Sequence, residues 1–383
     1  MWTSARRLAT VAMVACLALG LTAATAPAAP SVPTTMQLQR SLDAIADAPG
    51  APPGFSLLIQ RGKRSEYLHA GVADVRSGRE PNRGEHFRIA SVAKAFNAYL
   101  AVELATGPKP LSLSDTVGEW IPGVLPAAEK VTLLQLLQHT SGLADYIRAD
   151  AFVKEFLAEP GRYFPPTELT GFVKGEPLEF VPGSRYHYSD TDNIAAGLIE
   201  EAASGRGYES LLASEVFGPL RMPGSSLPRV VRMPRPYMHG YDIEVGKKPE
   251  DVSELINPSG AWASGGIVST PADLARFVPA YVPAVLRAFR QAGGAFRPGS
   301  SSPPGPGKNA AGPGIFEYKT GCGTVYGHTG SFPGYRIFVA GSADGRRAIV
   351  FVTNAQVVPG QGSAKVSEAI RRFQSRAVCR ALR

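Results

Sequence analysis

Hydrophobic positions along the chain follow two periods, one helical and one extended. Segments whose apolar residues recur every three or four positions are predicted to be helices: 36–48, 91–105, 132–138, 194–204, 208–217, 271–282 and 367–376. Apolar segments with a β-rich composition, most of them bounded by turn signals, are predicted to be strands: 55–59, 66–72, 315–318, 324–326, 335–340 and 348–353. Strands therefore stand near both ends of the sequence, and helices fill its middle.

Turn and breaker residues mark the boundaries of these elements. Arg61-Gly62 and Asp344-Gly345 each join two predicted strands as hairpin turns, and Gly107-Pro108 ends the helix that starts near Ser91. Residues 297–314 are rich in Pro, Gly and Ser, so they are expected to form a loop and not a core element.

This order of elements predicts an α/β (α+β) fold. The terminal strands would join in one antiparallel sheet flanked by terminal helices, with an all-helical lobe inserted between them. The sheet lobe would take residues 35–90 and 315–383, and the helical lobe residues 110–290. A cleft between the lobes is where a functional site is expected.

The first 28 residues have the layout of a secretory signal peptide. Arg6 and Arg7 precede an apolar stretch that runs to Ala24, and the small residues around Ala28 fit a cleavage site. An uncleaved membrane anchor is the alternative, since the stretch is marginally long enough to cross a bilayer. A lipoprotein would use Cys16, but the residues before it form a weak lipobox. We therefore expect a secreted or extracytoplasmic protein with no stable membrane anchor after cleavage.

Composition and charge exclude several classes of protein. The 383 residues are 44% hydrophobic and 19% charged, which is not the composition of a disordered chain. The net charge is +8 and falls to +6 when residues 1–28, with two arginines and no acid, are removed. No block of five like charges occurs, so nucleic-acid binding is not expected.

Two cysteines remain after cleavage, Cys322 and Cys379. In an oxidising compartment they can form one disulfide, which we favour, while two free thiols in the core are the alternative. The chain holds no third mature cysteine and only six scattered histidines, so no metal-ligand cluster is visible. We expect no metal and no cofactor.

Ser91-Val92-Ala93-Lys94 places a hydroxyl and an amine one helical turn apart. An un-ionised serine is a weak nucleophile that needs an adjacent base, and Lys94 or a group paired with it can serve. The start of the helix adds a backbone donor for developing negative charge. The pattern alone is weak, because Ser91 as a helix cap beside a solvated Lys94 is the structural alternative.

Two further motifs strengthen this hypothesis. Tyr188-Ser189-Asp190 precedes the helix that begins near residue 194, and Tyr188 there can hold a proton over the cleft, although a tyrosine at a helix start is more often simply packed. His328-Thr329-Gly330 follows the strand 324–326, where Gly330 would let a ligand lie against the strand edge. The chain contains no Gly-x-Ser-x-Gly, which argues against an α/β-hydrolase.

The three motifs, in this order, resemble those of the serine β-lactamase and penicillin-binding family. The similarity is greatest to D-alanyl-D-alanine carboxypeptidases and to class C β-lactamase-like hydrolases whose third motif starts with His. It runs from about residue 35 to the C-terminus, and the segments 137–143 and 260–270 also fit the family.

The resemblance implies a role for each motif residue. Ser91 would be the acylated nucleophile, Lys94 its activating partner, and Tyr188 the general base or a proton relay. The backbone N–H groups of Ser91 and Ser331 would form the oxyanion hole.

The third motif would bind the substrate through His328, Thr329 and Gly330. If a protonated His328 held a substrate carboxylate, activity on free acids would fall as the pH rises through its pKa, ordinarily about 6.5. Residues 319–321 spell the commoner Lys-Thr-Gly form of this motif, but the glycines that follow would break a strand at once.

One position departs from the family pattern, because Asp190 stands where the family usually has Asn. An Asn amide can donate a hydrogen bond to a substrate carbonyl, and a carboxylate cannot. Asp190 would also favour the charged form of Lys94, which weakens Lys94 as a base and favours Tyr188 in that role. The recognition of peptide or β-lactam side chains by Asp190 is therefore in doubt.

The family resemblance implies a serine hydrolase that works through an acyl-enzyme. The leading expectation is a D-alanyl-D-alanine carboxypeptidase or D-stereospecific peptidase, and the alternative is an esterase or β-lactamase on the same scaffold. A non-catalytic penicillin-binding or sensor protein is the alternative from another class. The expected partners are small peptides, esters or β-lactams, including peptidoglycan peptides, and the protein is expected to be a monomer.

Overall fold

The computed structural model describes residues 32–106, 109–244, 246–298, 305–357 and 364–383. The expected signal peptide, with Cys16, lies outside the described residues, as do Gly107-Pro108 and part of the expected loop 297–314. Among the described helices, none combines the length and the hydropathy that a bilayer crossing needs.

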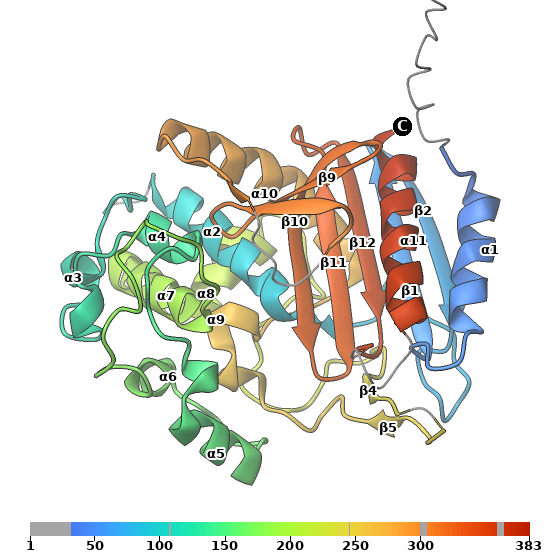
Figure 1. Ribbon diagram of the computed structural model, residues 1–383, viewed down its shortest axis with the longest axis horizontal. Helices are drawn as coiled ribbons and strands as arrows, with labels where there is room; N and C mark the ends of the chain where they lie inside the picture. Colours follow the sequence, from blue (N-terminus) through green and yellow to red (C-terminus); the bar gives the residue numbers. More distant parts are fainter. Residues whose placement is uncertain (1–31, 107–108, 245, 299–304, 358–363) are drawn as a thin grey trace, which may run out of the picture.

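The described chain contains an eight-stranded antiparallel sheet (Figure 1). In sheet order its strands are β2 (Arg64–Gly71), β1 (Gly54–Arg61), β12 (Arg347–Thr353), β11 (Tyr335–Gly341), β10 (Gly323–Phe332), β9 (Phe316–Thr320), β8 (Lys308–Ala311) and β7 (Arg297–Pro298). Short pairs lie outside it: β3 (Phe87–Arg88) with β6 (Val268–Ser269), and β4 (Tyr241–Asp242) with β5 (Glu250–Asp251).

Helices cover both faces of the sheet, and most lie on one side. The α-helices are α1 (Thr35–Ala46), α2 (Ala93–Leu104), α3 (Val117–Trp120), α4 (Leu133–Leu137), α5 (Asp150–Ala158), α6 (Pro166–Gly171), α7 (Asp190–Ser204), α8 (Tyr208–Leu211), α9 (Trp262–Gly265), α10 (Pro271–Gln291) and α11 (Ala364–Leu382). The other helical segments are the 3-10 turns η1 (Ala90–Val92), η2 (Pro126–Ala128), η3 (Tyr146–Arg148) and η5 (Pro258–Gly260), and the π-helix η4 (Leu212–Phe217).

The two ends of the chain meet in the sheet, as the sequence predicts. β1 lies between β2 and β12, with Phe55 opposite Thr353 and Arg61 opposite Arg347. α1 and α11 pack side by side on one face, and the helical part of the chain packs on the other (Figure 1). β12 is buried on both faces for this reason, so its sequence is an almost unbroken apolar run.

The predicted loop 297–314 is partly wrong. Arg297–Pro298 and Lys308–Ala311 are strands β7 and β8 at the edge of the sheet, and β8 pairs with β9. Lys-Asn-Ala-Ala has no β-branched or aromatic residue, so its strand conformation comes from the pairing partner and not from intrinsic preference.

The helix predicted over 271–282 also runs further than expected. α10 continues to Gln291 through Pro279 and Pro283. Each proline costs the helix a backbone hydrogen bond, but the buried face of α10 carries Phe277, Tyr281 and Phe289 along its length. Tertiary packing outweighs the local penalty.

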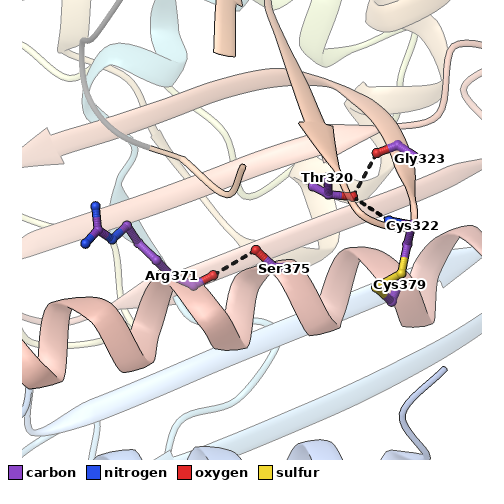
Figure 2. Close-up of a disulfide and its surroundings, with 6 residues drawn as sticks. All are labelled: Thr320, Cys322, Gly323, Arg371, Ser375 and Cys379. Atoms are coloured by element: carbon purple, nitrogen blue, oxygen red, sulfur yellow. Dashed lines mark hydrogen bonds between the residues drawn. A yellow bond between two sulfur atoms is a disulfide. The ribbon is translucent and has the colours of Figure 1, made fainter. Parts of the chain in front are cut away.

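Cys322 and Cys379 form the predicted disulfide, with their Cα atoms 5.1 Å apart (Figure 2). Cys322 lies in the turn between β9 and β10, where its N–H bonds to the hydroxyl of Thr320, and Cys379 lies in the last turns of α11. The bond therefore fastens the C-terminal helix to the strand pair that carries the third motif.

Candidate active site

Ser91 stands where the chain turns from β3 into α2. The residue before it, Ala90, has a φ of +51°, a backbone conformation that residues other than glycine rarely adopt. Such strain occurs at functional sites when the surroundings hold it in place. Ser91 does not cap the helix, because Val92 is the cap of α2, and Lys94 is completely buried. The alternative of a capping serine beside a solvated lysine is therefore wrong.

The hydroxyl of Ser91 is contacted by both of the residues that the sequence pairs with it. Tyr188 Oη donates to Ser91 Oγ at 2.8 Å, and Lys94 Nζ donates to the same oxygen at 3.2 Å. Tyr188 comes from the segment before α7, so the helical part of the chain and η1 meet at this oxygen. The arrangement places two proton carriers on one candidate nucleophile.

Lys94 is held from two other directions. Its ammonium lies 2.6 Å from Asp190 Oδ1 and 2.8 Å from the carbonyl oxygen of Ser264 in α9. Asp190 is fixed in turn, since its N–H donates to Asp145 Oδ1 at 3.0 Å. Burial, and then the charge of Asp190, raise the pKa of Asp145 to about 7. The carboxyl groups of Asp145 and Asp190 thus both interact with the ammonium of Lys94.

Tyr188 is an un-ionised phenol in this setting. Burial, and then the negative charge of Asp190, raise the pKa of Tyr188 well above its usual value. The expectation that Asp190 favours Tyr188 as the base is therefore not supported, because a phenolate beside Asp190 is costly. A neutral phenol that both accepts and donates a proton fits this geometry better.

A buried pair supports the ring of Tyr188. The ring centroid of His139 lies 4.3 Å from that of Tyr188, and His139 Nδ1 lies 3.0 Å from Asp192 Oδ2. Burial lowers the pKa of His139 well below its usual value and raises the pKa of Asp192 well above it. Ser141 donates to the other oxygen of Asp192. These buried contacts hold the ring of Tyr188 from the segment 137–143 and from α7.

Strand β10 passes the site with one edge open. β9 pairs with β10 only as far as Gly327, so within the described part of the chain residues 328–332 pair with β11 alone. Phe332 and Tyr335 close a two-residue turn, and in the alternating ladder of an antiparallel pair their neighbour Ser331 directs its N–H away from β11. The free N–H thus faces the open edge. Ser331 and Ser91 line the same cavity.

His328 of the third motif differs from the expectation in its burial. His328 is 1% exposed, and burial lowers its pKa to about 3, with the charge of Lys94 acting in the same direction. His328 Nδ1 lies 2.6 Å from the carbonyl oxygen of Thr329, an acceptor only, so Nδ1 carries the hydrogen. Burial therefore disfavours the expected protonated His328 that holds a carboxylate. Thr329 is buried as well.

Lys319 of the alternative Lys-Thr-Gly triplet lies elsewhere. Its side chain is 67% exposed and pairs with Glu317 along β9. By contrast, Gly330 packs directly on Ile89 and Ala90, next to Ser91.

A cavity of about 330 Å³ opens beside Ser91. Ser91, Asp190 and Ser331 are among the polar residues that line it. A concave apolar space with a few converging polar groups is the usual form of a substrate site. The wall is largely apolar, and among the described residues that line it are Tyr146, Ile147, Phe152, Val153, Phe156, Leu157 and Ile256.

The profile of the family described as Beta-lactamase matches residues 42–369, most of the chain. The chain belongs to the Beta-lactamase family.

Relatives in this family are hydrolases and penicillin-binding proteins. The chain is 25% identical to penicillin-binding protein 4* of Bacillus subtilis over 319 residues, which cover 79% of the chain and 68% of that protein. It is 28% identical to a D-aminopeptidase of Cereibacter sphaeroides over 214 residues, which cover 54% of the chain and 39% of that protein.

The fold is also found in solved structures of serine hydrolases. A D-stereospecific amidohydrolase from a Streptomyces species superposes with a TM-score of 0.73 and 28% identity, over 88% of this chain and 98% of that one. As a member of the Beta-lactamase family with these neighbours, the chain is a serine hydrolase by family.

Three features of the site escaped sequence reasoning. Ser264 contacts Lys94 through its backbone carbonyl oxygen, a group that every residue type has. The side chain therefore gives no signal, and only the position of Ser264 within the family segment 260–270 indicated a role. Asp145 carries no motif of its own. The apolar wall on α5 has a signal, since Phe152, Val153 and Phe156 recur at helical spacing, but such spacing ordinarily indicates core packing.

Proposed function

We propose that the protein is a serine amidohydrolase or peptidase of the D-stereospecific type that forms an acyl-enzyme on Ser91. The observation that carries this proposal is the pair of hydrogen bonds on Ser91 Oγ, from Tyr188 at 2.8 Å and from Lys94 at 3.2 Å. The similarity to a D-stereospecific amidohydrolase and to a D-aminopeptidase supports the substrate class.

The chemistry balances with the groups at hand. Ser91 Oγ attacks the carbonyl carbon while its proton passes to Tyr188 Oη, and Tyr188 gives its own phenol proton to the amide nitrogen. The C–N bond then breaks and the amine leaves, with Tyr188 again an un-ionised phenol and Lys94 still an ammonium. Water hydrolyses the resulting ester along the same path in reverse. The N–H groups of Ser91 and Ser331 are proposed to stabilise the oxyanion, since preorganised donors are a large contribution in acyl transfer.

Carboxypeptidase activity, the other half of the leading expectation, has less support. A free substrate carboxylate needs a cation or several donors, and His328 is neutral because burial lowers its pKa to about 3. Esterase activity is the second candidate, since the cavity beside Ser91 is apolar enough to take an acyl chain. A protein that is acylated without turnover is the third.

We further propose that the protein is exported and works as a monomer outside the cytoplasm. The N-terminal pattern of residues 1–28 supports export, and so does the Cys322–Cys379 disulfide, a bond that persists in oxidising compartments.

Intact mass spectrometry tests the nucleophile. The purified chain is incubated with an organophosphonate and with a fluorescent penicillin, and the adduct is mapped. We expect one adduct, on Ser91, which Ser91→Ala abolishes. Ser114→Ala is the matched control, since it removes an exposed serine from the segment before α3 and should leave the labelling unchanged. A label that persists in Ser91→Ala would refute the proposal.

A further inference from the structure

The cavity beside Ser91 combines a largely apolar wall with a negatively charged residue, Asp190. α5 contributes Phe152, Val153, Phe156 and Leu157 to the wall. Among the described residues that line the cavity, Asp190 is the only charged one. A site of this kind is complementary to a ligand that joins a bulky apolar group to a positive charge.

Asp190 has one carboxylate oxygen to spare. Its Oδ1 contacts Lys94 Nζ at 2.6 Å, whereas its Oδ2 makes no hydrogen bond within the described ranges of the chain. The side chain is 13% exposed and lies at the cavity wall. A carboxylate oxygen only accepts hydrogen bonds, so Oδ2 is suited to an N–H donor of a ligand, and best to a charged one.

The same surroundings give little support to a negatively charged ligand. No Lys, Arg or His is among the described residues that line the cavity. Lys94 lies behind it, buried, and is engaged by Asp190 and by the carbonyl of Ser264. His328 is buried with its Nδ1–H bonded to the Thr329 carbonyl. A substrate carboxylate in this cavity would meet Asp190, and the buried Lys94 is already paired with that residue.

We propose that the acyl half of the substrate is an amino acid with a free α-ammonium group and a bulky apolar side chain. The ammonium binds Asp190 Oδ2, and the side chain lies against the wall formed by α5. Lys94 Nζ contacts both Ser91 Oγ and Asp190 Oδ1, so the attacking oxygen and the ammonium acceptor fall within the span of one aminoacyl unit. This inference rests on the proposed function and adds to it the part of the substrate that Asp190 selects.

The reaction needs no further reactant. A bond forms between Ser91 Oγ and the aminoacyl carbonyl carbon, the amide C–N bond breaks, and the leaving amine takes the proton that Ser91 gave up. Water then replaces Ser91, and the free amino acid departs with its ammonium group unchanged.

The test compares two substrates that differ only in the amine. Phenylalanine p-nitroanilide, in each enantiomer, is measured against 3-phenylpropionic acid p-nitroanilide, which has the same ring and leaving group but no ammonium. A hydrogen bond to a charged group contributes about 1.5–3 kcal/mol. We therefore expect kcat/KM to favour one phenylalanine enantiomer by roughly 10- to 100-fold.

Two variants locate the effect. Asp190→Asn keeps the size of the side chain and should remove most of this preference, whatever it does to kcat through Lys94. Asp150→Asn removes the same charge from an exposed position at the start of α5, outside the cavity lining, and should keep the preference. If the preference is unchanged in Asp190→Asn, the proposal is overturned.

A binding measurement covers the case in which Asp190→Asn has no turnover. Calorimetry on Ser91→Ala, with and without Asp190→Asn, gives dissociation constants for phenylalaninamide and 3-phenylpropanamide. We expect only phenylalaninamide to lose affinity with Asp190→Asn. Equal affinity for both amides on Ser91→Ala would overturn the proposal.

Failure of this inference and failure of the proposed function differ in outcome. Ser91 could be labelled while 3-phenylpropionic acid p-nitroanilide, the amide without the amine, or the hexanoyl ester of p-nitrophenol is hydrolysed better than phenylalanine p-nitroanilide. That result would support the serine hydrolase and contradict the ammonium site. If Ser91 takes no label and no amide or ester is hydrolysed, both fall.

Discussion

Gly330 lies so close to Ile89 that a Cβ on Gly330 would stand 2.3 Å from the carbonyl oxygen of Ile89. The same Cβ would lie 3.1 Å from the Cβ of Ala90, the strained residue before Ser91. The close contact between β10 and η1 therefore requires glycine, and it sets the position of Ser331 relative to Ser91.

Gly330→Ala should consequently separate β10 from η1 and lower kcat/KM. A misplacement of about 1 Å in an active site can cost about 100-fold in rate, which is the scale we expect. Gly175→Ala is the control, since among the described residues, apart from its chain neighbours, none has a heavy atom within 4 Å of the added Cβ. Steady-state kinetics of both variants check the prediction, and equal activities would contradict it.

The state of His328 can be examined through pH profiles. Because burial lowers the pKa of His328 to about 3, its charge does not change between about pH 5 and pH 8. The profiles of kcat/KM for a free-acid substrate and for a neutral ester should therefore run parallel in this range. A decline near the ordinary histidine pKa of about 6.5 that affects the acid substrate alone, and that His328→Lys shifts upward, would show a protonated His328 instead.

Asp145 should make stability depend on pH. Burial raises its pKa to about 7, whereas the unfolded chain loses this proton near 3.8. Between these values the folded chain holds a proton that the unfolded chain lacks, so the free energy of unfolding falls as the pH rises. Asp145→Asn keeps an acceptor for the N–H of Asp190 and removes this contribution.

The measurement is Tm at about pH 5 and about pH 7 for both proteins, two points within the window where this proton differs between the states. The wild type should lose more stability than Asp145→Asn between these two conditions, since titrating groups distant from Asp145 contribute equally to both. An identical change in Tm would show that Asp145 does not titrate in this window.

The disulfide should contribute to global stability. It joins residues 57 apart in sequence, and the chain-entropy relation gives about 4 kcal/mol for a loop of this length. Replacing both cysteines by serine should lower the free energy of unfolding by up to that amount, measured by denaturant titration. Non-reducing peptide mapping provides the control for bond formation. If both thiols of the wild type can be alkylated, the disulfide is absent.

The sequence predicts the fold well where one residue pattern decides it. The apolar runs of β11 and β12 and the amphipathic spacing of α1 are strong local signals, and each is confirmed. β8 was missed because its strand conformation depends on β9, and the second half of α10 because two prolines conceal the packing of its buried face.

The candidate site was predictable to a similar extent. Ser91, Lys94 and Tyr188 converge as their motifs imply, since those motifs specify side chains that must touch. The charge of His328 was not predictable, because its burial arises from residues distant in sequence. The same holds for the Ser264 carbonyl, whose position depends on how α9 packs against α2.

The pairing of β1 with β12 affects how the chain acquires its structure. Gly54 donates its N–H to the side chain of Asn354, 300 residues later, and Ser91 receives its neighbour Ser331 from the last part of the chain. During synthesis, Ser91 is made long before β10, the strand that carries Ser331. Folding must then wait for the C-terminal strands, and such long-range contacts make it slow. Synthesis of the C-terminal strands is therefore a condition for assembling the cavity around Ser91.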